Sequence, residues 1–163
     1  MKNLFLRFPT LGDKENYINY QKEEHNIDID YEKWLLEKEK QSQQEKIVDG
    51  KVPRTILLLT DDKNVIYGQV SIRYSINTPK LKQYIGHVGY EIRSKYRGQG
   101  LGNLILKLAL IECQKIGINN VMISCKKNNI LSAKVIEYNG GMFEREEFIE
   151  EENEYYKIYY IKI

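Results

Sequence analysis

The chain has 163 residues, the usual size of one domain, and we expect a single domain over residues 1–163. Its 25 Lys and Arg nearly balance its 23 Asp and Glu, which gives a formal net charge of +2. A protein that binds nucleic acid through bulk charge would carry a strong basic excess, so the balance argues against this class. Two cysteines are too few for a disulfide-stapled scaffold or a cysteine-based zinc site. We expect no nucleic-acid partner and no metal.

The apolar segments are too short for a membrane span. A span needs roughly 18 apolar residues, whereas the central run from Ile56 to Leu59 is strand-sized. Near the N-terminus, Arg7 and Pro9 interrupt the apolar segment, and the small-residue cleavage site of a signal peptide is missing. We therefore expect a cytoplasmic protein that does not bind membranes.

The first half of the chain predicts one strand, two helices and three further strands. Residues 3–8 alternate and are stopped by Pro9, and helical patterns run from residue 10 to about 25 and from 31 to 46. Strands are expected over residues 54–60, 65–76 and 84–93. Gly68 is typical of a bulge, whereas Gly86 and Gly89 indicate that something approaches the backbone of the third of these strands closely.

The second half predicts a helix, a strand, a helix and a hairpin. Residues 98–116 carry apolar side chains at helical spacing, and Gly117 ends the pattern. We expect a short buried strand over residues 121–125, a helix over 130–138, and hairpin strands over 142–150 and 154–163. The predicted order is β-α-α-β-β-β-α-β-α-β-β, with no internal repeat.

A glycine-rich loop separates the strand that ends near residue 93 from the long helix. It reads Arg97-Gly98-Gln99-Gly100-Leu101-Gly102 and fits the pattern Gln/Arg-x-x-Gly-x-Gly/Ala. The free N–H groups and dipole of a helix N-terminus attract phosphate, the glycines lack an obstructing Cβ, and Arg97 adds a positive charge. A P-loop string is absent, and the dinucleotide fingerprint fails because Asn103 stands at its third glycine. A glycine-softened turn without a ligand is the alternative.

In this strand–loop–helix setting, the chain resembles the GNAT family of acyl-CoA-dependent N-acetyltransferases over nearly its whole length. A second stretch, Asn129-Ile130-Leu131-Ser132 in a helix ended by Gly140-Gly141, is similar to the family's later N-x-x-A/S helix. Residues 86–93 resemble a poorly characterised bacterial subgroup. The resemblance implies an α/β three-layer sandwich with a mixed, mostly antiparallel sheet, in which a splayed strand pair binds acetyl-CoA.

The resemblance also implies where the donor binds. Main-chain N–H groups of the loop would hold the coenzyme A pyrophosphate, through Arg97, Gly98, Gln99, Gly100, Leu101 and Gly102. The backbone at Tyr90 and Ile92 would pair with the pantetheine arm and hold the thioester carbonyl, because their strand would splay from residues 121–125. Asn129 and Ser132 would face coenzyme A from the following helix.

The reaction itself requires proton transfers. The amine must lose a proton before it attacks the thioester, and the departing thiolate can take one from an acid. Many family members have that acid, a Tyr, seven residues after the helix Asn, but here the position holds Ile136. Tyr138 lies about 200° further around the helix and cannot simply substitute. Cys125, Ser132 or one of the tyrosines could replace it, and none is favoured by spacing.

Two side chains are candidates for the base that deprotonates the amine. An ordinary His is largely neutral near pH 7, and His87 lies on the strand expected to border the acetyl group. Strand alternation places His87 and Glu91 on one face, with Tyr90 and Ile92 on the other. His87 could instead be a hydrogen-bonded strand residue and Glu91 a surface charge. A water-relayed or substrate-assisted route needs neither.

The acceptor is expected to be the amine of a small molecule or peptide. Arg73 either binds an acidic part of this acceptor or pairs with an acid such as Glu91, and Trp34 either lines the acceptor side or belongs to the core. His25, at a helix end among acidic residues, is expected to be solvated. The seven Glu of residues 144–154 either attract a cationic amine or form a solvated edge.

The resulting prediction is an enzyme that moves an acetyl group from acetyl-CoA to a primary amine by direct attack in a ternary complex. The alternative is a non-catalytic acyl-CoA-binding module, because Ile136 replaces the usual tyrosine. The tyrosine-rich residues 155–161 either pack internally or form a homodimer surface.

Overall fold

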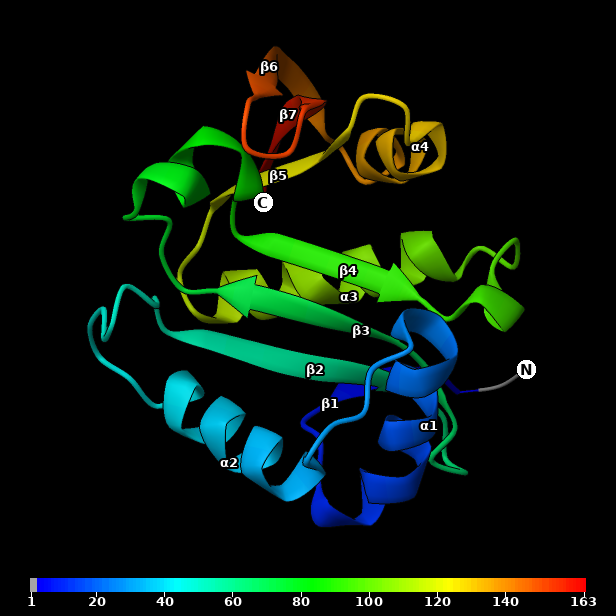
Figure 1. Cartoon of the computed structure of the whole chain (residues 1–163). Coiled ribbons are helices and arrows are strands. Elements are labelled where there is room, and N and C mark those ends of the chain that lie inside the picture. Colours follow the sequence, from blue (N-terminus) through cyan, green and yellow to red (C-terminus); the bar gives the residue numbers. More distant parts are fainter. Residues whose placement is uncertain (1–2) are drawn as a thin grey trace.

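A computed structural model describes residues 3–163, and its seven strands form one sheet (Figure 1). The strand order across the sheet is β1-β2-β3-β4-β5-β7-β6. The strands are β1 (Phe5–Arg7), β2 (Arg54–Thr60), β3 (Ile66–Arg73), β4 (Val88–Ile92), β5 (Asn120–Lys126), β6 (Met142–Ile149) and β7 (Glu154–Lys162). The main helices are α1 (Lys14–His25), α2 (Tyr31–Ser42), α3 (Leu101–Lys115) and α4 (Ile130–Tyr138).

The sheet is mixed and mostly antiparallel, as predicted. Every neighbouring pair of strands is antiparallel except β4 and β5, which run parallel. β7 lies between β5 and β6, and within it Ile158 and Tyr159 are buried. Residues 155–161 thus form part of an interior strand, with Ile158, Tyr159 and Ile161 buried and Tyr155 exposed.

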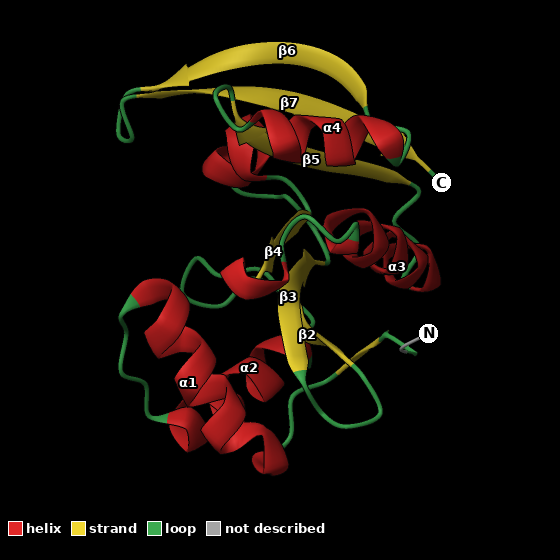
Figure 2. Cartoon of the chain, turned by 90° about the vertical axis from the view of Figure 1, so that its right-hand side faces the viewer, coloured by secondary structure: helices red, strands yellow, loops and turns green. Residues whose placement is uncertain are grey.

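Helices cover both faces of the sheet, which gives three layers (Figure 2). On one face, α1 and α2 bury an aromatic cluster in which Tyr17, Tyr20 and Tyr31 pack on Leu58 and Ile66. On the other face, α3 and α4 cover the larger core, whose members include alternate residues of β2, β3 and β4. Each strand of the centre thus sends alternate side chains to two different cores, as the period of two requires.

The predicted order of elements is confirmed, and several boundaries differ, among them the end of β3, which lies at Arg73 rather than 76. The strand predicted over residues 84–93 is shorter, because Leu81–Ile85 forms a short π-helical turn before β4. Gly86 has a φ of +74°, and a Cβ there would lie 2.4 Å from the carbonyl oxygen of Met122. This close approach, which the sequence predicted, bends the chain into β4. Helix α2 ends at Ser42 rather than 46, and α3 begins at Leu101 rather than 98.

The predicted bulge is also present. The pairing of β2 with β3 shifts register where Leu59 faces Gly68 and Thr60 faces Ile66, so Tyr67 is the extra residue. A Cβ on Gly68 would lie 2.2 Å from the carbonyl oxygen of Glu91, so only glycine fits there. Over residues 3–163, no helix is both long enough and apolar enough to cross a bilayer.

Candidate active site

Strands β4 and β5 separate soon after they meet, as predicted. Their ladder pairs Val88 with Ile123, next to a bond from the His87 N–H to the Met122 carbonyl. The carbonyl of His87 accepts a hydrogen bond from the backbone N–H of Arg73 on β3. Counting from His87, every second residue of β4 therefore directs its backbone N–H and carbonyl toward β3. Tyr90 and Ile92 therefore direct their backbone groups to the edge that β5 has left. This is the edge on which the pantetheine arm was expected.

The glycine-rich loop has the properties of an anion site. Gly98 and Gly100 adopt φ values of +75° and +76°, and a Cβ at either position would meet no atom within 4 Å. In the part of the chain that the structure describes, the backbone N–H groups of residues 98–103 have no acceptor. They precede or begin the 15-residue helix α3, whose dipole favours negative charge at this end. The residues present thus fit a pyrophosphate.

Two residues of the loop have additional structural roles. The Arg97 Nε donates to the Ile92 carbonyl at 2.9 Å, and its Nη2 lies 3.6 Å from the Glu24 carboxylate, while the side chain remains 60% exposed beside the loop. A Cβ on Gly102 would lie 3.1 Å from Val135 of α4. Gly102 therefore permits close packing of α3 on α4, whereas Gly98 and Gly100 leave open space.

The gap between β4 and β5 is bridged by side chains from both sides. The Tyr90 hydroxyl lies 3.3 Å from the Ser132 hydroxyl of α4, and Ser132 also contacts the buried thiol of Cys125 on β5. Burial raises the pKa of the Tyr90 phenol, so it stays protonated at neutral pH. Asn129 is the N-cap of α4, because its side chain accepts from the Ser132 N–H at 3.1 Å.

The positions around the expected tyrosine explain its absence. Ile136 is fully buried in the core beneath α4, where a phenol would need both space and a partner. Tyr138 is 78% exposed and points away from this core, as its angular offset predicted. The side chains brought together on the donor side are instead those of Tyr90, Ser132 and Cys125.

A pocket of about 400 Å³ opens on the opposite face of β3 and β4, the face that α1 and α2 cover. Gly89 contributes to it because a Cβ there would meet nothing within 4 Å. The lining residues are His25, Arg54, Ile56, Gln69, Val70, Ser71, Gly89, Tyr90 and Glu91.

Glu91 is the carboxylate of this pocket and is held by three side chains. It accepts from the Tyr20 hydroxyl and from the Gln69 Nε2 at 2.8 Å, and the His25 Nε2 lies 3.0 Å from its Oε2. Burial, together with the hydrogen bond to Glu91, raises the pKa of Tyr20 far above its ordinary value, so Tyr20 remains a donor. His25 is the last residue of α1 and is 36% exposed, as expected, but the end of α1 lies over β4 and brings its ring into contact with Glu91.

His87 has a different environment from the one expected of a base. Its side chain is only 9% exposed, its Nδ1 accepts from the Met122 N–H at 3.0 Å, and it does not line the pocket. Burial and the nearby charge of Arg73 lower its pKa, so the ring is neutral at pH 7. These contacts favour the hydrogen-bonded strand residue over the base.

Arg73 and Trp34 were expected on the acceptor side. Arg73 lies on the pocket face of β3 but does not pair with Glu91, and its Nη1 makes only a 3.4 Å contact with the Gly86 carbonyl. The ion pair considered for these two residues is therefore wrong. Trp34 stacks on Tyr17 with 4.3 Å between ring centroids, and it packs in the aromatic cluster between α1, α2 and the sheet.

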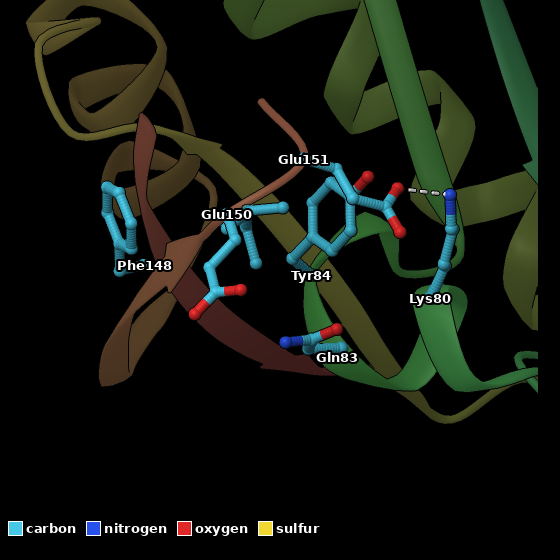
Figure 3. A pocket seen from close by; sticks show the side chains of 7 residues that line it. Lys80, Gln83, Tyr84, Phe148, Glu150 and Glu151 are labelled. Carbon is cyan, nitrogen blue, oxygen red and sulfur yellow. Dashed lines mark hydrogen bonds and ion pairs between the residues drawn. The ribbon is translucent and has the colours of Figure 1, made fainter. Parts of the chain in front are cut away.

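A second pocket lies beside the acidic hairpin and is drawn in Figure 3. There Lys80, which precedes β4, points at Glu151 and pairs with it. The neighbouring acids are paired in the same way, since Lys127 binds Glu146 and Arg145 binds Glu147. The glutamates of residues 144–154 are thus largely neutralised within the fold.

Comparison with solved structures supports this reading of the fold. The chain is similar to a chimera of spermidine N-acetyltransferase SpeG from Vibrio cholerae and hSSAT, with 17% identity, coverage of 96% of this chain and 94% of that one, and a TM-score of 0.70. It is similar to yncA, a candidate acetyltransferase from Salmonella typhimurium solved with its cofactor acetyl-CoA, with 13% identity, coverage of 98% and 93%, and a TM-score of 0.67. A candidate ribosomal-protein-serine acetyltransferase from Vibrio cholerae gives 16% identity, coverage of 100% and 95%, and a TM-score of 0.68.

The sequence comparisons identify the family. No curated protein matches the chain. A family model described as an acetyltransferase (GNAT) domain matches residues 3–142, most of the chain. That range includes the glycine-rich loop, the splayed strands and the pocket beside Glu91. The chain therefore belongs to the GNAT acetyltransferase family.

Proposed function

We propose that the protein is an N-acetyltransferase that moves the acetyl group of acetyl-CoA to a primary amine of a small molecule or peptide, by direct attack in a ternary complex. One observation carries the proposal: an anion-binding loop and an open strand edge lie on one side of β4, and a pocket with a held carboxylate lies on the other. Donor and acceptor can thus meet across a single strand without a covalent enzyme intermediate.

The donor would be held mainly by backbone. The N–H groups of residues 98–103 would take the pyrophosphate, and Arg97 would add charge. The open edge at Tyr90 and Ile92 would hold the pantetheine arm. Acetyl-CoA supplies an activated thioester, and each of these contacts positions it.

Glu91 is the residue that we assign as base. A carboxylate that lines the pocket can take the proton of the acceptor ammonium, and His25 beside it can receive or share that proton. Tyr20 and Gln69 fix the orientation of the carboxylate. On the donor side, the protonated Tyr90 phenol with Ser132 is the proton source that takes the place of the missing tyrosine.

The proposal is tested by thiol release from acetyl-CoA over a panel of polyamines, amino acids, aminoglycosides and peptide N-termini. We expect at least one primary amine to release coenzyme A in a 1:1 ratio with its acetylated product, measured by mass spectrometry. A calorimetric titration with coenzyme A alone measures the affinity of the same protein preparation for coenzyme A.

Two outcomes would contradict the proposal. Tight coenzyme A binding with no turnover on any amine would indicate the acyl-CoA-binding module. Stabilisation by ATP or NAD without stabilisation by coenzyme A would show that the loop binds a nucleotide cofactor instead.

A further inference from the structure

Two arginines lie side by side on the sheet face of the pocket, away from Glu91: Arg54 lines the pocket, and Arg73 is its neighbour beyond the lining residues. Arg54 on β2 and Arg73 on β3 are direct partners in the register. Neither guanidinium has an acidic partner among residues 3–163. This arrangement is unusual, because arginines that leave water in a folded protein are normally paired with carboxylates.

The pairing of like charges is costly in the structure as it stands. Burial and repulsion by Arg54 lower the pKa of Arg73 to about 10, and burial also lowers the pKa of Arg54. Lys38 of α2 adds to the cluster, since burial and Arg54 together lower its pKa. Like charges directly opposite on neighbouring strands destabilise a sheet. An anion between them would relieve this repulsion.

Polar atoms near the arginines also lack partners. The Arg54 Nε and the Ser71 Oγ are buried without a hydrogen bond. Ser71 lines the pocket and lies two residues from Arg73 on the same face of β3. The contacts that Arg54 and Arg73 do make are long, at 3.3 Å to the Gln41 side chain and 3.4 Å to the Gly86 carbonyl. These N–H and O–H groups without hydrogen-bond partners indicate that a ligand with hydrogen-bond acceptor atoms binds here.

The two ends of the pocket carry opposite charge. Gln69 donates to Glu91 and lies four residues from Arg73 on β3, which is about 13 Å along the strand. The long side chains of Glu91 and Arg73 can reach toward each other, so their charged groups can lie closer together than these backbone positions. We propose that the acceptor is an amino carboxylate, whose amine binds beside Glu91 and whose carboxylate is bound by Arg54 and Arg73. The inference rests on the proposed function, because it names the acceptor class of the same pocket.

The test compares matched acceptors that differ in one charge. Thiol release is measured with 4-aminobutyrate and 4-aminobutanamide, with L-leucine and L-leucinamide, and with spermidine. We expect each carboxylate to have a KM about 10- to 100-fold lower than that of its amide, as a charged hydrogen-bonded contact provides. In Arg54→Gln and Arg73→Gln this preference should disappear, whereas coenzyme A affinity should not change. Arg145→Gln, in an ion pair on β6, is the matched control.

A second measurement reads anion binding without turnover. Saturation-transfer NMR should detect N-acetyl-4-aminobutyrate on the wild-type protein and on Arg145→Gln, but not on Arg54→Gln. If amines are acetylated and the amides or spermidine are used as well as the carboxylates, the inference is overturned and the proposed function survives. If no amine is acetylated but the Arg54-dependent signal is present, the anion subsite stands and the proposed function fails. If no amine is acetylated and the Arg54-dependent NMR signal is also absent, both the inference and the proposed function are overturned.

Discussion

The side chains around Glu91 come from three separate stretches of the chain. Tyr20 and His25 belong to α1, Gln69 belongs to β3, and Glu91 belongs to β4. Strand alternation placed Glu91 on the face opposite Tyr90 and Ile92, but it contains no information about which helix residues lie over that face. His25 was for this reason assigned to solvent, although it is a neighbour of the carboxylate.

His87 gives a pH-dependent prediction. Its pKa is lowered in the folded protein, so the unfolded chain binds a proton more readily than the folded one as the pH falls below about 6.5. The stability that His87 contributes is thus complete above that pH and is lost at lower pH. We expect His87→Gln to flatten the decrease in Tm between pH 7.5 and pH 5.5, measured by thermal denaturation. A slope equal to that of the wild type would contradict the assigned environment.

At the scale of elements, the N-terminus of α3 and the splay of β4 from β5 make the side of the site to which we assign the acetyl donor. The helix start follows from local sequence, because the glycines of the loop permit the left-handed backbone and the amphipathic pattern that follows sets the helix, whereas the splay was expected only from the family resemblance. The π-helical turn before β4 could not be predicted, because Tyr84 and Ile85 have strong strand propensity. Their tertiary contacts with the hairpin decide the local structure.

A carboxylate at Gly100 should abolish donor binding. In Gly100→Glu, a negative charge would stand at the helix N-terminus among the unpartnered N–H groups, where the pyrophosphate is expected. We expect coenzyme A affinity to fall at least about 100-fold, measured by calorimetric titration.

Gly50→Glu is the control for this experiment. Gly50 also has a positive φ and open space around it, so the same change brings similar backbone strain far from the loop. An affinity for coenzyme A that is unchanged in Gly100→Glu, or reduced equally in both variants, would contradict the assigned phosphate site.

Across the whole molecule, α1 connects the two sides of the site. Its end lies over the pocket through His25, while Glu23 pairs with Arg93 and Glu24 accepts from the Ser94 N–H at 2.8 Å, just before the glycine-rich loop. The pocket beside Glu91 and the glycine-rich loop, which we propose bind acceptor and donor, are thus joined by contacts of one helix.

The element order and the glycine-rich turn before α3 could be predicted because both depend on patterns within a short window, and the fold class followed from the family resemblance. The acceptor side depends on long-range packing. Arg54 and Arg73 meet only through the register of β2 and β3, which no spacing along the chain reveals. The sequence predicted a role for Arg73 on the acceptor side, but it gave no signal for Arg54.

The central claim is that the amine loses its proton to Glu91 on the face of β4 opposite the donor. The most direct measurement is kcat of Glu91→Gln with an acceptor from the panel, beside its affinity for coenzyme A, with Glu112→Gln on the surface of α3 as control. We predict that kcat falls about 100-fold or more while coenzyme A affinity is unchanged. A kcat equal to that of the wild type would contradict the account.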